Sequence, residues 1–315
     1  MCVEGSAKMW TVRRSGRIAI LAVVVLLVAS VASAQITIRL RRDFVEQFKN
    51  RVTIDATFTV EKAHEKPNTP SKDGDLHIAG RAPEIKLPVV AELMNAKDHM
   101  DAVGAIHAVE GTGQTIPIKG AWRIWAEHAG SDDQIQGAAL APFTTTNPDH
   151  VFEIHPISEV GGLDTLPSLK PITGFNYKDA EQAFMKYEDI RLNLHVTPTT
   201  VTLHTAGAGF NYVKFIMELE EDPCFLVDDG MFVRASALDM EGELIARHRR
   251  MAIIKDSAAF EAVRTLHKGD QVTVVGVPRL NMAVLSWRIR NAAAHPDVLQ
   301  WNLPYEIIIV AVNPQ

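Results

Sequence analysis

The sequence predicts a mainly β protein with short helices, an α+β arrangement in which two similar five-stranded β-barrels follow one another. Its 315 residues, 47% hydrophobic and 22% charged, are typical of a globular chain and exclude a disordered or collagen-like one. Short segments with alternating apolar residues, bounded by turn-forming residues, are typical of strands. Shifting the chain over itself by 156 residues aligns many of the turn formers, which indicates a diverged duplication.

The N-terminus has the layout of an export signal. An uninterrupted run of small and apolar residues, Ile18–Ala34, follows three arginines and ends in Ala32-Ser33-Ala34. A positive region, an apolar region and a small-residue cleavage site are the parts of a secretory signal peptide. The run is also just long enough to span a bilayer, so a retained anchor over residues 18–34 is the alternative. We therefore expect an exported protein, periplasmic or secreted, whose only membrane contact is this segment if it is not cleaved.

Cleavage after Ala34 makes the chain more acidic. It removes four basic residues and one acidic residue, so the formal net charge changes from −6 to −9. A body of this charge repels polyanions, so we do not expect a nucleic-acid partner. The basic run Arg247–Arg250 has few aromatic residues beside it in the sequence, whereas base stacking needs them. Cleavage also leaves Cys224 without a disulfide partner, and we expect it to be a small buried apolar residue.

The duplication is clearest around one strand of each half. Gly113, Gly120 and Arg123 align with Gly269, Gly276 and Arg279, and the apolar positions between the glycines coincide as well. Glycines that bound an alternating segment suit a tightly bent barrel strand. The predicted elements then follow one order in both halves: alternating strands (52–60 and 212–219), a strand after an Asp-Gly turn (76–78 and 232–237), a short helix (98–108 and 257–266), the glycine-bounded strand and a closing strand.

This order of elements, with one helix before the fourth strand, resembles the OB-fold, a five-stranded Greek-key barrel. The resemblance covers most of both halves and rests on element order and glycine placement. It implies an OB-like domain over residues 35–160 and a second over 205–315, after the signal segment 1–34. The linker 161–204 contains an amphipathic helix, because Ala180, Ala183, Phe184 and Tyr187 have helical spacing. We expect this helix to pack the two barrels together.

Ionisable residues that could form a ligand site gather in the first half. These are Asp75, His77, Glu127, His128, Glu153 and His155. Alternate residues of a strand lie on one face, so imidazoles and carboxylates of neighbouring strands could converge on a divalent metal, with His77, Glu153 and His155 as candidates. At an offset of 156 residues the second half has apolar residues at these positions. The barrel itself therefore does not require the polar set, and the second half is expected to be mainly structural. Mutual pairing of these groups is the alternative interpretation.

One segment of the first half is similar to staphylococcal-nuclease-type domains. Asp73-Gly74-Asp75, then Arg81 and Pro83-Glu84, follow the order of that family's motif. The resemblance implies calcium-dependent phosphodiester cleavage. The sequence departs from the family because Arg81 follows Asp75 by only six positions, too few for the family's hairpin, and Ala82 stands where the family has an aspartate.

Two functions follow from these observations. The first is an exported, non-catalytic protein of the cell envelope that binds an oligosaccharide, a peptide or another protein, without a cofactor. The alternative is a metal-assisted hydrolase, phosphodiesterase- or nuclease-like, with its site in residues 35–160. The sequence contains no H-E-x-x-H, G-x-S-x-G or Walker motif that would favour the enzyme.

Overall fold

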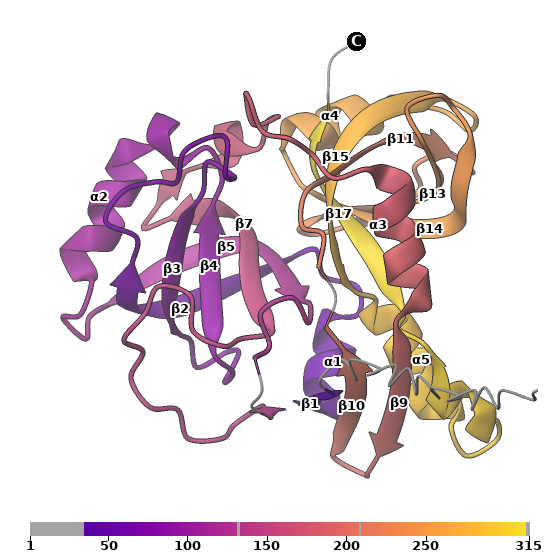
Figure 1. The fold of residues 1–315 in the computed structure, drawn as a ribbon, viewed down its shortest axis with the longest axis horizontal. Coiled ribbons are helices and arrows are strands. Elements are labelled where there is room, and N and C mark those ends of the chain that lie inside the picture. The colour runs from indigo at the N-terminus through magenta and orange to yellow at the C-terminus, as the bar shows by residue number, and fades with distance from the viewer. Residues whose placement is uncertain (1–34, 131–132, 208, 313–315) are drawn as a thin grey trace, which may run out of the picture. The chain divides into compact units, whose positions relative to one another are not determined.

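Two closed five-stranded barrels form most of the computed structural model, which describes residues 35–130, 133–207 and 209–312 (Figure 1). The predicted fold class, mainly β with two barrels and short helices, is confirmed. The signal or anchor predicted for the N-terminus lies outside the described residues. Within them, no helix combines the length and the apolar character that crossing a bilayer requires.

The first barrel closes in the order β2-β3-β4-β7-β5, with β5 pairing back onto β2. Helix α2 (Met100–Val109) connects the third strand to the fourth and buries Ala102, Val103 and Ile106. Pairing between β4 and β7 is parallel, and the other pairings of the barrel are antiparallel. The strands are β2 (Thr53–Ala63), β3 (Leu76–Arg81), β4 (Val89–Leu93), β5 (Thr115–Ile124) and β7 (Phe152–Val160), and β8 (Leu163–Asp164) extends β7.

The second barrel repeats this topology in the order β11-β13-β14-β17-β15, and β11 pairs with β13 to close it. Its parallel pair is β14 with β17. Helix α4 (Ala258–Val263) precedes the fourth strand, and Ser257 caps it by accepting from the Phe260 N–H at 3.1 Å. The strands are β11 (Val213–Leu219), β13 (Gly230–Leu238), β14 (Leu244–Ile254), β15 (Gln271–Leu280) and β17 (Tyr305–Val312), with β12 (Phe225–Val227) paired onto β13.

The strand order, the parallel pair and the helix before the fourth strand are those of the OB-fold in both barrels. The aligned glycines lie at equivalent irregularities. The register between β5 and β7 shifts at Gly120, and the register between β15 and β17 shifts at Gly276. Bulges of this kind bend a strand and help a small barrel to close.

A third sheet was not anticipated from the sequence. The predicted linker, 161–204, contains β9 (Arg191–Val196) and most of β10 (Thr200–Ala206). Strand β10 pairs along its length with β1 (Gln35–Arg41). Two short strands complete the sheet, β6 (Gln134–Ile135) and β16 (Gln300–Asn302). Its strands come from positions far apart in the sequence, so strand periodicity alone could not reveal which ones pair.

Helix α3 (Ala180–Asp189) occupies the positions where the spacing predicts an amphipathic helix, and its buried residues are the four expected ones. Asp179 caps it by accepting from the Gln182 N–H at 2.9 Å. The Tyr187 ring contacts Trp125, which follows the first barrel's β5, at 5.4 Å between centroids, and Tyr305 of the second barrel at 5.3 Å. These aromatic contacts join the helix to residues of both halves. Helices α1 (Arg42–Phe48) and α5 (Met282–Asn291) complete the set of α-helices among the described residues.

Two buried arginines connect the barrels. Arg123 of β5 donates to the Pro278 carbonyl of the second barrel at 2.9 Å. Arg279 of β15 donates to the carbonyls of Val52 and Trp122 in the first barrel, both at 2.9 Å. Its guanidinium also stacks on the Trp122 ring, 3.7 Å from the centroid. The two arginines are aligned in the sequence, and each bonds the backbone of the opposite barrel.

Candidate functional site

The six predicted site residues lie in one network of side chains in the first barrel, and its centre is His155. Asp75 precedes β3, and His155 lies on β7. Both are fully buried. The His155 Nε2 atom is 2.6 Å from the Tyr212 hydroxyl, which donates to Asp75 Oδ2 at 2.6 Å. Tyr212 precedes β11 of the second barrel, so both halves of the chain contribute to this network.

Glu92 of β4 connects the two predicted histidines. Its Oε2 atom lies 3.1 Å from His155 Nδ1, and its Oε1 atom lies 3.9 Å from His77 Nε2. His77 and Glu92 are direct cross-strand partners. Asp73 also lies 3.7 Å from His77 Nε2. Burial disfavours the charged form of His77, but these carboxylates outweigh that effect and raise its pKa from 6.5 to about 10.

The remaining predicted residues gather around Arg123. This arginine forms ion pairs with Glu153 and, at 3.0 Å, with Glu127. Glu153 Oε2 is 3.3 Å from His155 Nδ1. His128 joins the network indirectly, because its ring stacks on His150, whose Nε2 lies 3.4 Å from Glu153 Oε1.

Glu153 has a charged counterpart in the second barrel. At the offset of 156 residues it aligns with Ile309, but strand pairing gives a different equivalent. Arg123 lies opposite Glu153, and Arg279 lies opposite Glu306. The connection between the two strands produces this difference, because Glu153 follows Arg123 by 30 residues and Glu306 follows Arg279 by 27. A buried Arg–Glu pair is therefore common to both barrels, and Glu153 does not distinguish the first one.

Burial and neighbouring charges shift the pKa values of the residues at the centre of the network in different directions. Burial raises the pKa of Asp75 well above 3.8, against the pull of His155. Burial acts in the same direction on Glu153, but Arg123 holds the pKa of that carboxyl well below 4.5. Burial disfavours the charged form of His155, yet the neighbouring carboxylates, Glu92 foremost, together outweigh it and raise the pKa of His155 above 6.5.

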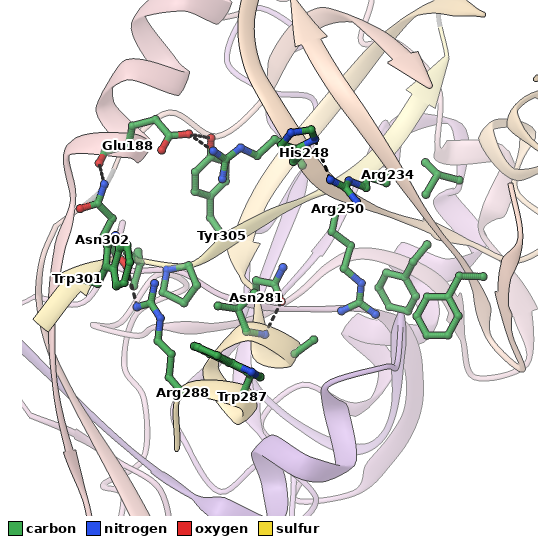
Figure 2. A pocket seen from close by; sticks show the side chains of 18 of the residues that line it. Glu188, Arg234, His248, Arg250, Asn281, Trp287, Arg288, Trp301, Asn302 and Tyr305 are labelled. Carbon is green, nitrogen blue, oxygen red and sulfur yellow. Dashed lines mark hydrogen bonds and ion pairs between the residues drawn. The ribbon is translucent and has the colours of Figure 1, made fainter. Parts of the chain in front are cut away.

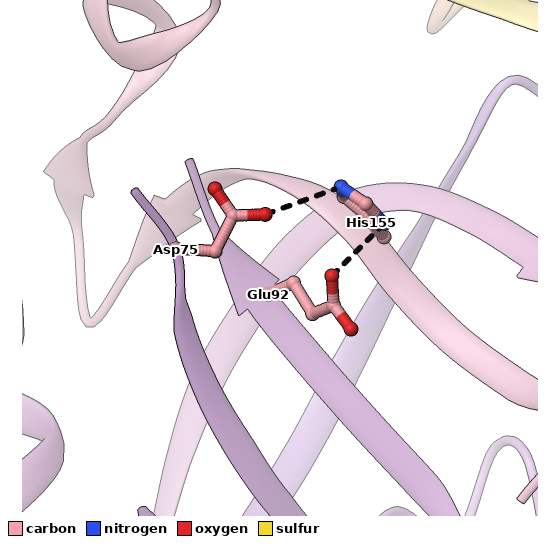
Figure 3. Close-up of side chains that lie close together, drawn as sticks. All are labelled: Asp75, Glu92 and His155. Carbon is pink, nitrogen blue, oxygen red and sulfur yellow. Dashed lines mark ion pairs between the residues drawn. The ribbon is translucent and has the colours of Figure 1, made fainter. Parts of the chain in front are cut away.

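The metal candidates are regrouped by the structure. Asp75, Glu92 and His155 offer ligand atoms that all lie within 4.8 Å of one another (Figure 3). Glu153 instead forms an ion pair with Arg123. His77 lies outside this group of three and contacts it through Glu92. Sequence reasoning missed Glu92 and Tyr212. A signal for Glu92 exists, since it is the one charged residue in the buried strand Val89–Leu93.

A groove of about 680 Å³ lies on the second barrel, which was expected to be mainly structural (Figure 2). It is bordered by β12, β13, β14, α5 and the segment 301–305. The second and third strands of the barrel, β13 and β14, form the face that OB-folds use for oligonucleotides and oligosaccharides. Three aromatic side chains on the groove are exposed: Phe225 (43%), Trp287 (47%) and Trp301 (52%).

Most of the arginines on the groove already have carboxylate partners. Arg234 pairs with Glu220 at 3.0 Å, and Arg249 pairs with Glu188 at 2.7 Å. Arg250 stacks on Phe232, 3.4 Å from the ring centroid, and pairs with Glu306 at 3.2 Å. Glu306 is shared with Arg279, so the carboxylates neutralise Arg234 and Arg249 in full and Arg250 in part.

Arg288, the fourth arginine on the groove, differs from these three in its partners. Its Nη1 donates to the Asn302 carbonyl at 2.8 Å, and its guanidinium lies 6.0 Å from the Trp301 ring centroid. Among the described residues it has no carboxylate within ion-pair distance. It is the groove's unneutralised cation, beside an exposed indole.

The structure corrects two expectations about this half. Arg249 and Arg250 do have aromatic neighbours, because folding brings Tyr305 and Phe232 from other strands against them. Cys224 is exposed rather than buried. It precedes the short edge strand β12, where Phe225 and Leu226 are exposed as well. The sequence does contain a signal for the groove, because Trp287 of α5 and Trp301 of β16 are two tryptophans close together in the chain.

Near the groove, Glu220 gives a testable pH dependence. Burial raises its pKa, but bonds from His248 and Ser236 prevail and lower it from 4.5 to about 2. The stabilisation is therefore present above pH 4.5 and is lost as the pH falls through about 2. Glu220→Gln should lower the free energy of unfolding at neutral pH, and urea titrations should show the deficit shrinking across this acid range. A deficit that does not depend on pH would contradict the assignment.

No protein-family model matches this sequence, and no curated protein does either. Among solved structures, the chain is similar to a deletion mutant of the single-stranded DNA-binding protein from Thermus aquaticus, with a TM-score of 0.22, 10% identity and coverage of 84% of this chain and 93% of that one. It is also similar to a chain described as "Structural mimicry for functional antagonism", with a TM-score of 0.19, 11% identity and coverage of 75% and 90%. The OB-fold assignment rests on the strand order itself.

Proposed function

We propose that the protein is a non-catalytic binding protein whose groove on the second barrel holds an oligosaccharide carrying an acidic group. The observation that supports this is the combination of exposed Trp287 and Trp301 with the unneutralised Arg288, itself 8% exposed, in a groove beside the β13–β14 face. Indole rings offer flat apolar surfaces on which the apolar face of a sugar ring packs, with a polar edge beside it. The arginine would then pair with a carboxylate of the ligand.

The charge distribution favours this ligand over a nucleic acid. Binding of a nucleic acid gains most of its affinity from neutralising several phosphates. Arg234, Arg249 and Arg250 are already paired with carboxylates, so they contribute little to such binding. A ligand with few charges and stackable rings suits this groove better. The proposed export to the cell envelope, which depends on the N-terminal segment, would place the protein among such oligosaccharides.

Intrinsic tryptophan fluorescence tests the proposal directly. The full chain is titrated with a panel of oligosaccharides that contain uronic or sialic acid, their neutral counterparts and an oligothymidylate. We expect an acidic oligosaccharide to change the tryptophan emission and to bind more tightly than its neutral counterpart. Trp301→Ala and Arg288→Gln should each weaken binding about tenfold or more, as anchor residues at binding sites do.

The first barrel supplies a matched control. Arg81 lies over the ring of Phe143 at 5.6 Å, an arginine–aromatic pair outside the groove. Phe143→Ala and Arg81→Gln should leave the affinity unchanged. If the protein bound the oligothymidylate and none of the oligosaccharides, the ligand would be a nucleic acid and the proposal would be wrong. Equal affinity of the groove variants and the wild type would remove the groove from the function.

Hydrolysis is the less supported alternative. The carboxylates and imidazole that could serve a metal-assisted reaction, Asp75, Glu92 and His155, are at most 2% exposed. A phosphodiester needs direct access to such groups. The exposed aromatic groove on the second barrel therefore supports binding rather than cleavage.

A further inference from the structure

We propose that Asp75, Glu92 and His155 bind a divalent transition-metal ion within the first barrel. The three residues come from adjacent positions of the barrel wall, because β4 pairs with both β3 and β7. Their ligand atoms lie within 4.8 Å of one another (Figure 3). Two carboxylates and an imidazole are a donor set found in protein sites for zinc and related ions.

The charges of the buried network support an ion at this position. Asp75, Glu92 and Glu153 are buried carboxylates, and Arg123 is the one arginine that pairs within this group. Burying an unpaired charge is unfavourable. A divalent cation would neutralise the Asp75 and Glu92 carboxylates, whose nearest basic groups are otherwise the imidazoles of His155 and His77. Arg123 is already engaged by Glu153 and Glu127.

A second observation concerns hydrogen bonding. The Asp75 Oδ1 atom is buried and has no hydrogen-bond partner among the described residues. Buried carboxylate oxygens are almost always satisfied, so an oxygen of this kind calls for a partner. The other oxygen, Oδ2, faces His155 at 3.8 Å, so a cation held by both Asp75 oxygens would provide this partner.

The surroundings match those of metal-binding histidines. Such histidines usually have a second carboxylate that fixes the orientation of the ring. Glu153 Oε2 lies 3.3 Å from His155 Nδ1. The Tyr212 hydroxyl lies 2.6 Å from His155 Nε2 and donates to Asp75 Oδ2 at 2.6 Å, so an ion on Nε2 would take the place of this hydroxyl contact. Asp73 and His77, next to the site, have partly exposed side chains, at 24% and 14%. Because Tyr212 belongs to the second barrel, ion binding would stabilise the contact between the halves.

The test uses the full chain, stripped with a chelator and then titrated with Zn²⁺, Co²⁺ and Ca²⁺ in parallel. We expect one Zn²⁺ per chain, a higher thermal midpoint with Zn²⁺ than with Ca²⁺, and visible absorption bands when Co²⁺ binds. Asp75→Asn and Glu92→Gln preserve side-chain shape. Each should weaken Zn²⁺ binding by more than the about 10- to 100-fold that loss of an outer partner causes.

His107 and Glu110 supply the control, since they form a partly exposed His–carboxylate pair at 3.0 Å elsewhere in the barrel. Replacing both by glutamine should not change Zn²⁺ binding. A wild-type chain that binds no Zn²⁺ and shows no Co²⁺ bands would overturn the proposal, whatever the variants do. Zn²⁺ binding unchanged by Asp75→Asn and Glu92→Gln would overturn it too. Neither result depends on the groove of the second barrel.

Discussion

Replacing Glu306 by glutamine is expected to lower the free energy of unfolding by about 3 to 5 kcal/mol, the range found when a buried ion pair loses one partner. Glu306 and Arg279 are both fully buried, and Arg279 Nε donates to Glu306 Oε1 at 2.7 Å. Burial lowers the pKa of Arg279 to about 10 even with this carboxylate beside it. Without it, a charged guanidinium would stay buried with only backbone carbonyls and the Trp122 ring as partners.

Urea unfolding at neutral pH measures this effect. The double variant Arg279→Gln with Glu306→Gln should be more stable than Glu306→Gln alone, because the fully buried guanidinium left without Glu306 has been removed. Arg250, the other partner of Glu306, keeps its stacking on Phe232 in both variants. Glu159→Gln is the control, since Glu159 is an exposed carboxylate on the closing strand of the other barrel. Its effect should stay within about 0.5 kcal/mol. If the double variant is no more stable than Glu306→Gln, an unpaired Arg279 is not the cause.

Introducing a methyl group at Gly120 is expected to destabilise the first barrel by about 3 kcal/mol, at the upper end of the usual overpacking range. A Cβ at this position would lie 2.4 Å from the Pro156 carbonyl oxygen and 2.9 Å from Ile157 Cα. Both atoms belong to the backbone of β7, which cannot move without disturbing the closure of the barrel. Overlap with backbone is therefore not relieved by rotating a side chain.

Two matched alanine variants separate this effect from a general cost of replacing glycine. At Gly276 the nearest atom is the side-chain carbon Ile307 Cγ2, at 2.3 Å, so a smaller loss is expected because that side chain can turn. Gly104 lies in α2 with nothing within 4 Å of a Cβ. Gly104→Ala should stabilise the chain by about 0.5 to 1 kcal/mol. Equal losses for Gly120→Ala and Gly276→Ala would show that backbone overlap does not decide the cost.

The chain's repeat could be predicted from sequence because it depends on local rules. Gly120 and Gly276 mark the bent strand of each barrel, and Ser257 marks the start of a helix. Strand alternation and helix capping act within a few residues, so a single sequence reveals them. The third sheet escaped because the pairing of β1 with β10 joins residues far apart in the chain.

For the candidate sites, the sequence by itself determined that ionisable residues concentrate in the first half, and Asp75 and His155 do meet there. Only the tertiary structure decided that Glu92 and Tyr212 join them, and that Glu153 belongs to a pair repeated in the second barrel. The groove was also decided by folding, because its tryptophans come from a helix and a short strand that pack beside β13 and β14. The physical reason is that burial and charge pairing depend on neighbours in space, which strand pairing selects from distant parts of the chain.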